Sequence, residues 1–552
     1  MNTTFAAIVT GIVFCAVSYA QTPQPQNPSD APVAIPTFHC LGLYWSPAGG
    51  AANKAVQIRY RRQGASEWKE ALPMRYNPIL KTDEDLADYR GSIVHLKPAT
   101  TYEVHLTLAG TQTSTNLIAT TWSEKVPAGE TIRVGNRDTP LAITESGTPT
   151  ARRVYDGRGA TIDVRHRHDS CITVNASHVI LRGFTLKGAG AANNVGRRPI
   201  GAIRIEGGHD ILIEDCDITD WGRLNPKTGF GFNMDSAILS FSAGLKRLIV
   251  QRCKLHHPTY DGSTWSEPVY PTHTMGPQCI SLFNTAGNHV IRYNECFSDI
   301  DHMYNDVIGG GSNGSFRGSP GHDSDIYGNF ISNCWDDGLE VEGGNRNVRI
   351  WDNYITQCMN MIGNAATSIG PLYIWRNVVT HSQSKPGAGG MHFLKMGYAT
   401  SEDWMTGHQY IFHNTLFRSD DWLPVGGFGG NRIVKHTVSR NNIIHIRSAD
   451  GRSHSDAKQN IDNDYDYDLY NGQIPTGSEA HGIRGEPIYA EGAGFDAATK
   501  TGSFQLAPNS PGANAGQTIP NFSDGYTGKA PDIGAHQRGT PPFRYGVHAS
   551  QP

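Results

Sequence analysis

Acidic side chains crowd one short stretch near the middle of this 552-residue chain. The segment WDDGLEVE, residues 335–342, contains Asp336, Asp337, Glu340 and Glu342. Carboxylates held close together repel one another, so at least one of them should have a raised pKa unless a cation lies among them. A protonated acid beside an ionised partner is the pair that glycoside hydrolysis needs. A group of carboxylates is also the ligand set that Ca²⁺ prefers.

Matching similar segments adds residues to this acidic centre. Aligning the paired glycines of NDVIGG (305–310) and LEVEGG (339–344) brings Asp306 beside Glu340, and a step of 24 residues carries Glu340 onto Asn364. Neighbouring strands lie roughly 4.8 Å apart, and a pair two strands apart would be separated by roughly 9.6 Å. These separations match retaining and inverting glycosidases respectively, and the sequence leaves the choice open. The candidate catalytic residues are Asp306, Asp337, Glu340 and Glu342.

Other side chains of the same predicted face are candidates for holding a substrate. Arg204 and Glu206 lie earlier in the chain and could bind sugar hydroxyls or an acidic group. His392 and Lys395, in GMHFLKMG, lie beyond the acidic segment, where either could act as a base. Trp335 could stack on a sugar ring. The candidate substrate-binding residues are Arg204, Glu206, Trp335, Asp336, Asn364, His392 and Lys395, and no residue is assigned to a metal.

The element that must position these residues is indicated by a repeated phrase, an apolar residue followed three positions later by Asn. Its copies are Ile291–Asn294, Ile326–Asn329, Ile350–Asn353, Ile374–Asn377, Ile411–Asn414 and Val438–Asn441. Periods of 20–50 residues mark architectures in which each unit buries its apolar face on the next. The units are rich in Val and Ile and lack a helical period, which excludes helical repeats. We therefore predict a right-handed parallel β-helix with the Asn side chains stacked as an internal ladder.

Each predicted turn of the coil has a further strand about nine residues before its Asn phrase. Alternate residues of such a strand point to opposite sides. We expect the following residues to face the interior: Ile172, Val174, Ile203, Ile205, Ile238, Ile280, Leu282, Val307, Leu339 and Val341. We expect the residues of the other parity to face solvent: Arg204, Glu206, Asp235, Asp306, Glu340 and Glu342.

The chain divides into segments of different composition. Residues 1–20 are apolar and end in Ser-Tyr-Ala, which is typical of a signal peptide. Residues 21–35 are rich in Pro and Gln, which predicts a linker. Residues 36–122 contain alternating strands at the spacing of a β-sandwich. The coil with its N-terminal cap should span 123–470, and 471–552 should close its last turn.

Two family resemblances accompany this division. The phrase LKPATTYEV (96–104), with Trp45 and Tyr60, resembles the fibronectin type III pattern, which implies a sandwich used as a spacer or adhesion module. The repeats and the closing phrases FQLAPNSPGANAG and APDIGAHQRG resemble the pectate-lyase-like superfamily. That resemblance implies a β-helix that acts on polysaccharides as a lyase, hydrolase, epimerase or esterase. Motif fragments similar to the polygalacturonase-type hydrolases occur in a different order and spacing, so no catalytic role is carried over from them.

Composition bounds the possible partners. The net charge is −4 and the pI is about 6.6, so neither nucleic acid nor membrane insertion is expected. We expect a secreted or periplasmic monomer with a polysaccharide substrate. We favour a glycoside hydrolase without a cofactor. One alternative is a Ca²⁺-dependent lyase or epimerase of a uronic-acid polymer, in which Lys395, His392 or Arg204 removes the C5 proton. The other alternative is a non-catalytic surface or adhesion protein.

Overall fold

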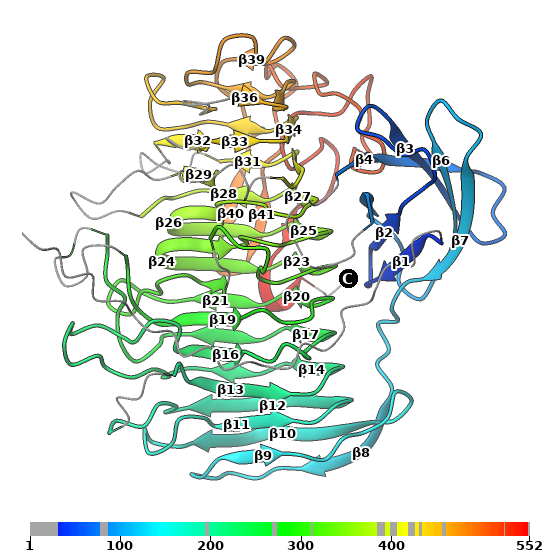
Figure 1. The fold of residues 1–552 in the computed structure, drawn as a ribbon. Helices are drawn as coiled ribbons and strands as arrows, with labels where there is room; N and C mark the ends of the chain where they lie inside the picture. The colour runs from blue at the N-terminus through cyan, green and yellow to red at the C-terminus, as the bar shows by residue number, and fades with distance from the viewer. Residues whose placement is uncertain are drawn as a thin grey trace, which may run out of the picture.

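Two β domains lie side by side in the computed structural model of the chain (Figure 1). The structure describes residues 31–549 except 78–86, 194–197, 266, 268–272, 311–312, 384–391, 398–403, 405, 418–424, 430–432, 455–459 and 524. The predicted signal peptide and most of the predicted linker lie outside these residues. Within the described ranges the chain is all-β, and no helix there is long and apolar enough to cross a membrane.

The N-terminal domain is an antiparallel β-sandwich of seven strands in the order β1-β2-β5-β4-β3-β6-β7. The strands are β1 (Val33–Pro36), β2 (Leu41–Trp45), β3 (Ala55–Arg62), β4 (Lys69–Tyr76), β5 (Tyr89–Ile93), β6 (Thr101–Leu108) and β7 (Ser114–Thr120). Alternate residues of β6, from Tyr102 to Leu108, are buried, as the pleat of a half-covered strand requires. The first strand begins at Val33, inside the segment expected to be linker.

The second domain is a parallel β-helix, in which 30 strands form one continuous hydrogen-bonded sheet wound into a coil. Its strands stack in three columns, here called the first, second and third faces. The first face contains β8 (Ala128–Arg133), β10 (Arg152–Asp163), β12 (Val179–Lys187), β14 (Ile211–Glu214), β17 (Leu248–Gln251), β20 (Val290–Arg292), β23 (Asp325–Tyr327), β25 (Val348–Trp351), β27 (Leu372–Trp375), β30 (Gln409–Phe412), β34 (Thr437–Arg440) and β37 (Asp464–Tyr465).

The second face follows each Asn position along the chain. It contains the later parts of β10 and β12, the first parts of β24 (Phe330–Glu340) and β26 (Tyr354–Asn364), and β15 (Asp217–Ile218), β18 (Lys254–His256), β21 (Glu295–Phe297), β28 (Val378–Val379), β31 (Thr415–Leu416), β35 (Ile443–Ile444), β38 (Leu469–Tyr470) and β39 (Ile483–Arg484).

The third face contains the ends of β24 and β26 together with β9 (Leu141–Ile143), β11 (Ile172–Asn175), β13 (Gly201–Gly207), β16 (Ser236–Ser240), β19 (Gln278–Leu282), β22 (Ile308–Gly309), β29 (His392–Met396) and β32 (Gly426–Phe428). In a separate two-stranded parallel sheet, β33 (Val434–Lys435) pairs with β36 (Asn460–Ile461). In the C-terminal segment, β40 (Gly494–Asp496), β41 (Thr501–Ser503) and β42 (Phe543–Arg544) form a small antiparallel sheet followed by a 3-10 turn, η2 (Gly546–His548).

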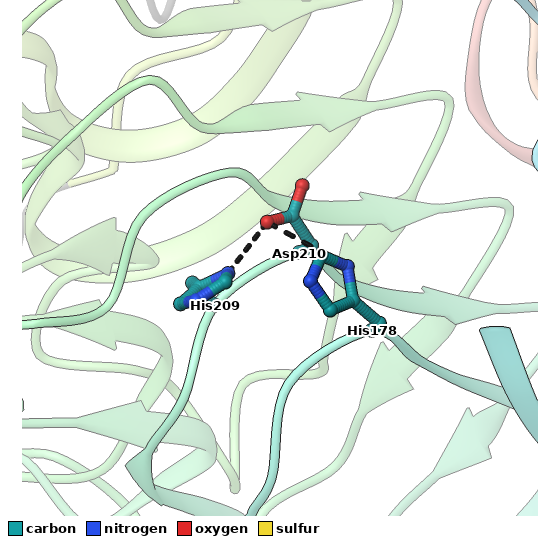
Figure 2. A group of neighbouring side chains, drawn as sticks. All are labelled: His178, His209 and Asp210. Atoms are coloured by element: carbon teal, nitrogen blue, oxygen red, sulfur yellow. Dashed lines mark hydrogen bonds and ion pairs between the residues drawn. The ribbon is translucent and has the colours of Figure 1, made fainter. Parts of the chain in front are cut away.

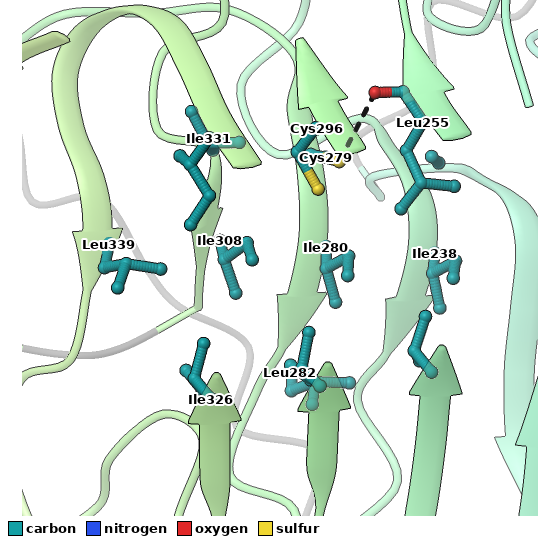
Figure 3. Packing of buried hydrophobic residues seen from close by; sticks show 14 of the residues in the cluster. Ile238, Leu255, Cys279, Ile280, Leu282, Cys296, Ile308, Ile326, Ile331 and Leu339 are labelled. Atoms are coloured by element: carbon teal, nitrogen blue, oxygen red, sulfur yellow. Dashed lines mark hydrogen bonds between the residues drawn. The ribbon is translucent and has the colours of Figure 1, made fainter. Parts of the chain in front are cut away.

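Apolar side chains fill the interior of the coil in rows. Ile238, Ile280, Ile308 and Leu339 occupy the same position on successive strands of the third face (Figure 3). Every residue predicted to face the interior belongs to this one buried cluster, which confirms those positions. The strict alternation is wrong at Ile308, which has the parity predicted to face solvent but also belongs to the cluster. The described cysteines are all buried free thiols.

The predicted Asn ladder is present at the turn between the first and second faces. Asn329 Nδ2 donates to Asn353 Oδ1 (2.9 Å), and Asn353 Nδ2 donates to Asn377 Oδ1 (2.9 Å). At the last copy the ladder uses Asn442 and not the predicted Asn441. The reason is the register: Ile411 pairs with Ser439, so the residue three positions further on is 442.

Other parts of the chain cover the outer side of the first face. A stack of aromatic rings runs along it, with 4.2 Å between the centroids of Tyr327 and Trp351 and 4.7 Å between those of Trp351 and Trp375. Phe38 and Val94 of the N-terminal domain pack on this stack. Polar contacts also join the two domains, since Tyr44 donates to Asp323 (2.7 Å) and Arg90 donates to the Ile369 and Gly370 carbonyls (2.9 Å each).

The C-terminal segment covers the outer side of the second face. Phe495, Phe504 and Tyr545 pack on Phe330 and Tyr354, and the ring centroids of Tyr354 and Phe495 are 3.9 Å apart. Near the end of the coil, residues of the same segment pack against Leu469. The segment expected to close the last turn therefore also lines the flank of the coil.

Candidate functional site

The acidic centre lies on the outer side of the third face, where β22, β24, β26 and β29 run side by side. Glu340 of β24 has a glycine beside it on each neighbouring strand: it pairs with Gly363, and the pairing of Ile308 with Leu339 brings Gly309 to its other side. Gly363 pairs in turn with Lys395. A row of glycines and long charged side chains therefore crosses four strands.

This register differs from the predicted one. Asn364 pairs with Met396, and Asp306 lies beside Asp337, whose N–H donates to Asp306 Oδ1 (3.0 Å). The predicted alignment of Glu340 is therefore wrong. Its neighbour on β26 is Gly363 and not Asn364, an error of one residue, and its neighbour on β22 is Gly309 and not Asp306, an error of three residues. A β-bulge between residues 334 and 337 shifts the pairing with β26, and such an extra residue cannot be counted from a repeat length.

Five carboxylates and one ammonium converge at this place. Oxygen atoms of Asp306, Asp336 and Asp337 lie within 4.8 Å of one another, and those of Asp337, Glu340 and Glu342 do the same. Lys395 Nζ contacts Asp337 Oδ2 and lies 3.4 Å from Glu342 Oε1 and 3.8 Å from Asp336 Oδ1. The prediction that these residues face away from the coil interior is met, but solvent reaches few of them.

Burial divides the centre into a floor and an accessible edge. The side chains of Asp337 and Glu342 have no exposed surface, and Asp306 and Asp336 are buried as well. Glu340 is partly exposed, and 23% of the Lys395 side chain is accessible. A substrate in solution could therefore touch Glu340 and Lys395 first.

Loops cover the floor of the site. Gln278 Nε2 and Asn305 Nδ2 donate to Asp306 Oδ2 (2.9 and 2.6 Å), and Thr274 Oγ1 donates to Asp336 Oδ2 (3.3 Å). None of these three residues was predicted from the sequence. Only Asn305 could have been found there, because it directly precedes the candidate residue Asp306.

The described part of the insertion after β22 lies over Glu342. Gly318 forms a bridge with Gly343, and Ser319 Oγ donates to the Gly309 carbonyl (2.8 Å). Asn345 Nδ2 ties the two segments together, since it donates to the carbonyls of Ser319 (2.9 Å) and Glu342 (3.2 Å). These contacts hold the segment against the backbone of residues 342–344, and Glu342 has no exposed surface.

Burial and like charges favour the protonated form of several of these carboxyls. Burial and the charge of Asp336 raise the pKa of Asp306 to about 7. Burial, followed by the neighbouring carboxylates, raises the pKa values of Asp337 and Glu340 well above the usual range. Burial alone would lower the pKa of Lys395, but the surrounding carboxylates outweigh it and raise that pKa well above its usual value.

The donor set fits a hard divalent cation. All candidate ligands are carboxylate oxygens, the type that Ca²⁺ and Mg²⁺ prefer. Two oxygens on opposite sides of a Ca²⁺ ion would be about 4.6–5.2 Å apart. The carboxylate oxygens of each group lie within 4.8 Å of one another, so their spacing is compatible with such an ion. Asp337 Oδ1 and Glu342 Oε2 are buried without a hydrogen-bond partner. Such unsatisfied buried oxygens, beside a single lysine, are what a cation would stabilise.

The remaining predicted substrate-binding residues lie elsewhere or are enclosed. Arg204 and Glu206 bond each other (2.5 Å) on β13, four strands away from β24. Asn364 is fully buried, and its amide donates to Gln409 of β30. Trp335 is only 2% exposed. Neither side chain can therefore contact a sugar ring from solution. His392 begins β29, near the centre.

A second polar cluster lies at the turn that precedes the first face. The side chains of His178, His209 and Asp210 point toward one another (Figure 2), and His209 Nδ1 lies 2.6 Å from Asp210 Oδ2. The Arg247 guanidinium binds both Asp210 oxygens, at 2.7 and 2.5 Å. Because an arginine already occupies the carboxylate, this cluster is an ion-pair network and not an open metal site.

Comparisons with known proteins complete the description. No family model matches the chain, and no curated protein matches it in sequence. One solved structure, XylC with xylose, aligns at 12% identity and a TM-score of 0.28 over 52% of this chain and 38% of that one. The catalytic domain of a GH87 α-1,3-glucanase in complex with tetrasaccharides aligns at 9% identity and a TM-score of 0.20 over 82% and 79% of the two chains. Likenesses of this size carry no argument about function.

Proposed function

We propose that this protein is a polysaccharide-degrading enzyme that cleaves or epimerises a uronic-acid polymer at the acidic centre of the third face. The observation that carries the proposal is the crowding of Asp306, Asp336, Asp337, Glu340 and Glu342 around the ammonium of Lys395. Hydrolysis needs two carboxyl groups that both reach the sugar. Burial leaves only Glu340 accessible, so most of this cluster is better suited to binding a cation than to attacking a glycosidic bond.

Either of two groups that share Asp337 would hold the ion: Asp306, Asp336 and Asp337, or Asp337, Glu340 and Glu342. A bound Ca²⁺ would neutralise the substrate carboxylate and so make the proton on the adjacent carbon more acidic. Lys395, on the accessible edge, is the residue placed to accept that C5 proton when it is a neutral amine. A cation that neutralised the surrounding carboxylates would remove the charges that raise the pKa of Lys395. In elimination the electrons of the C5–H bond form the C4–C5 double bond, and the C4–O bond breaks. The leaving oxygen then takes a proton from water, and Lys395 returns its proton to the hydroxide left behind. In epimerisation water instead gives a proton to the opposite side of C5, and Lys395 again returns its proton to the hydroxide.

A glycoside hydrolase is the second candidate. It is favoured by one observation: Glu340 is partly exposed and has a pKa raised well above the usual range, as a general acid requires. Under this alternative Glu340 protonates the glycosidic oxygen and a neighbouring carboxylate assists the attack. The Glu340→Gln protein should stay folded under both alternatives, because the side chain lies outside the coil.

One assay separates the candidates. The protein is incubated with uronic-acid polymers and with neutral polysaccharides, with Ca²⁺ or with a chelator, and both ultraviolet absorbance and reducing ends are measured. We expect absorbing, unsaturated products from a uronic-acid polymer that disappear with the chelator and in Lys395→Ala. Epimerisation would instead show as solvent deuterium at C5 without new chain ends. Reducing ends without absorbance that survive chelation would establish the hydrolase instead.

We also propose that the enzyme is exported and that its N-terminal domain is a sandwich of the fibronectin type III kind that serves as a spacer. The apolar segment at residues 1–20 and the antiparallel order of β1 to β7 support this. Cleavage before Gln21, read by mass spectrometry of the mature protein, would test the export signal.

A further inference from the structure

We propose that Phe241 and Phe283 form a stacking platform for the pyranose rings of the substrate, so that the polymer lies along the third face and across its strands. The inference rests on the proposed function and adds the direction and a binding site of the polymer. Neither residue touches the acidic centre, and both follow directly after strands of the third face, β16 and β19.

The two rings lie on adjacent strands in a fixed arrangement. Their centroids are 5.0 Å apart and their planes differ by 24°, so they stack. The backbone holds them in register, because Ser240 pairs with Leu282 and the Phe283 N–H donates to the Ser240 carbonyl (2.9 Å). A platform built on two hydrogen-bonded strands loses little conformational entropy when a ligand binds.

The platform is accessible, which is unusual for phenyl rings in this fold. Phe241 is 37% exposed and Phe283 is partly exposed. Among the described residues, the only other large aromatic side chain with comparable exposure is Trp265 (36%), on the loop whose Thr274 binds Asp336. Exposed aromatic surface of this kind marks a binding site more often than chance.

The platform lies on the same face of the coil as the acidic centre. The register of the third face places Arg204, Leu239, Ser281, Gly309, Glu340, Gly363 and Lys395 in one row. Phe241 and Phe283 follow Leu239 and Ser281 by two residues each. At one strand spacing per step, β19 is roughly 10 Å and β16 roughly 15 Å from β24, which contains Glu340. Beyond Phe241, the ion pair of Arg204 and Glu206 offers polar groups for sugar hydroxyls. The platform therefore lies beside the row that leads to Glu340 and Lys395.

The partner chemistry follows from this order of groups. The axial C–H groups of a pyranose make one face of the ring apolar, and that face packs on an exposed aromatic ring. The hydroxyl and carboxylate groups at the rim of the sugar then remain free for the charged residues on either side. A sugar polymer supplies such rings in a row, whereas a single sugar would occupy the platform or the acidic centre but not both.

The test compares Phe241→Ala, Phe283→Ala and the double variant with Ile118→Ala, which removes an exposed side chain of the N-terminal domain. Because the rings are exposed, all variants should fold, and circular dichroism checks this. We expect the double variant to raise KM for long polymer at least fivefold, with kcat within twofold of the parent. The shortest cleaved oligosaccharide should be affected less, and Phe241→Tyr should behave as the parent.

A second measurement separates this inference from the proposed function. Polymer binding is measured by affinity electrophoresis in the Glu340→Gln background, with and without the two Phe→Ala changes. Loss of binding in the double variant supports the platform even if the parent shows no cleavage. Cleavage by the parent with unchanged KM and unchanged binding in the double variant would overturn the platform and leave the proposed function standing. A parent that binds none of the polysaccharides would overturn both.

Discussion

Lys395 reaches Asp337 across an intervening strand because Gly363 lies between them. Lys395 is on β29 and Asp337 on β24, and β26 separates the two. A Cβ at residue 363 would lie 2.3 Å from Asp337 Oδ2 and 3.0 Å from Lys395 Cε. The missing side chain is therefore what allows the ammonium to enter the acidic centre.

Gly363→Ala should accordingly disconnect the lysine from the carboxylates. The methyl group has no room unless the Asp337 carboxylate or the Lys395 chain moves, so we expect kcat to fall at least tenfold in steady-state assays on the substrate. Gly485→Ala is the matched control, because a Cβ there meets nothing within 4 Å. Equal activity of the two variants would show that the Lys395 position is unimportant.

Lys395→Ala should destabilise the protein when no divalent cation is supplied. The change leaves Asp337 and Glu342 buried without a counter-charge. Removing one partner of a buried ion pair lowers the free energy of unfolding by about 3–5 kcal/mol. We expect the free energy of unfolding, measured in urea with chelator at pH 8, to fall by about that amount. Ca²⁺ should restore most of the loss.

Lys187→Ala serves as the control for this measurement. Lys187 pairs with Asp163 at 3.4 Å, and its side chain is 43% exposed. An exposed pair of this kind contributes less than about 1 kcal/mol. If both lysine variants lost the same small amount, the acidic centre would not depend on Lys395 for its stability.

Asp306 should make the chelated protein less stable as the pH rises. Its pKa is about 7 in the folded protein, against an ordinary value of 3.8 for an aspartate in the unfolded chain, so both states hold the proton at low pH. Between about pH 4 and pH 7 only the unfolded chain releases it, so the stability falls, by at most about 4 kcal/mol, and stays low above pH 7. Thermal melts in chelator at pH 5 and pH 8 should show this, and Asp306→Asn should flatten the difference. Parallel pH curves for the two proteins would contradict the assignment.

Sequence alone could predict the coil and most of the acidic centre, for a physical reason. The Asn column and the alternation around Ile280 and Leu339 are periodic, and a periodic pattern determines which side chains face inward. The neighbour of Glu340 on β26 was missed because one bulged residue before Asp337 changes the register without changing the repeat. Its neighbour on β22 was missed because the paired glycines used for the alignment are not opposite each other in the sheet. The burial of Glu342 was missed because the loop that covers it depends on tertiary packing, which has no period.

The Asn ladder offers a test of what holds the coil together. Asn353 is fully buried, accepts from the backbone N–H and side chain of Asn329 (3.1 and 2.9 Å) and donates to the Ile326 carbonyl (2.9 Å) and to Asn377 Oδ1 (2.9 Å). Asn353→Ala would leave these groups buried without partners, at about 1–3 kcal/mol each when water cannot replace the side chain. We expect a loss of about 3–5 kcal/mol in chemical unfolding.

Asn116→Ala is the control for the ladder, because Asn116 is exposed on β7 and its loss should cost about 0.5 kcal/mol or less. Since the ladder joins successive strands of the coil, the Asn353→Ala protein should also exchange the amide protons of β23, β25 and β27 faster, while those of the N-terminal sandwich stay protected. If Asn353→Ala were as mild as Asn116→Ala, the stacked amides would be a consequence of the winding, and the apolar rows alone would stabilise it.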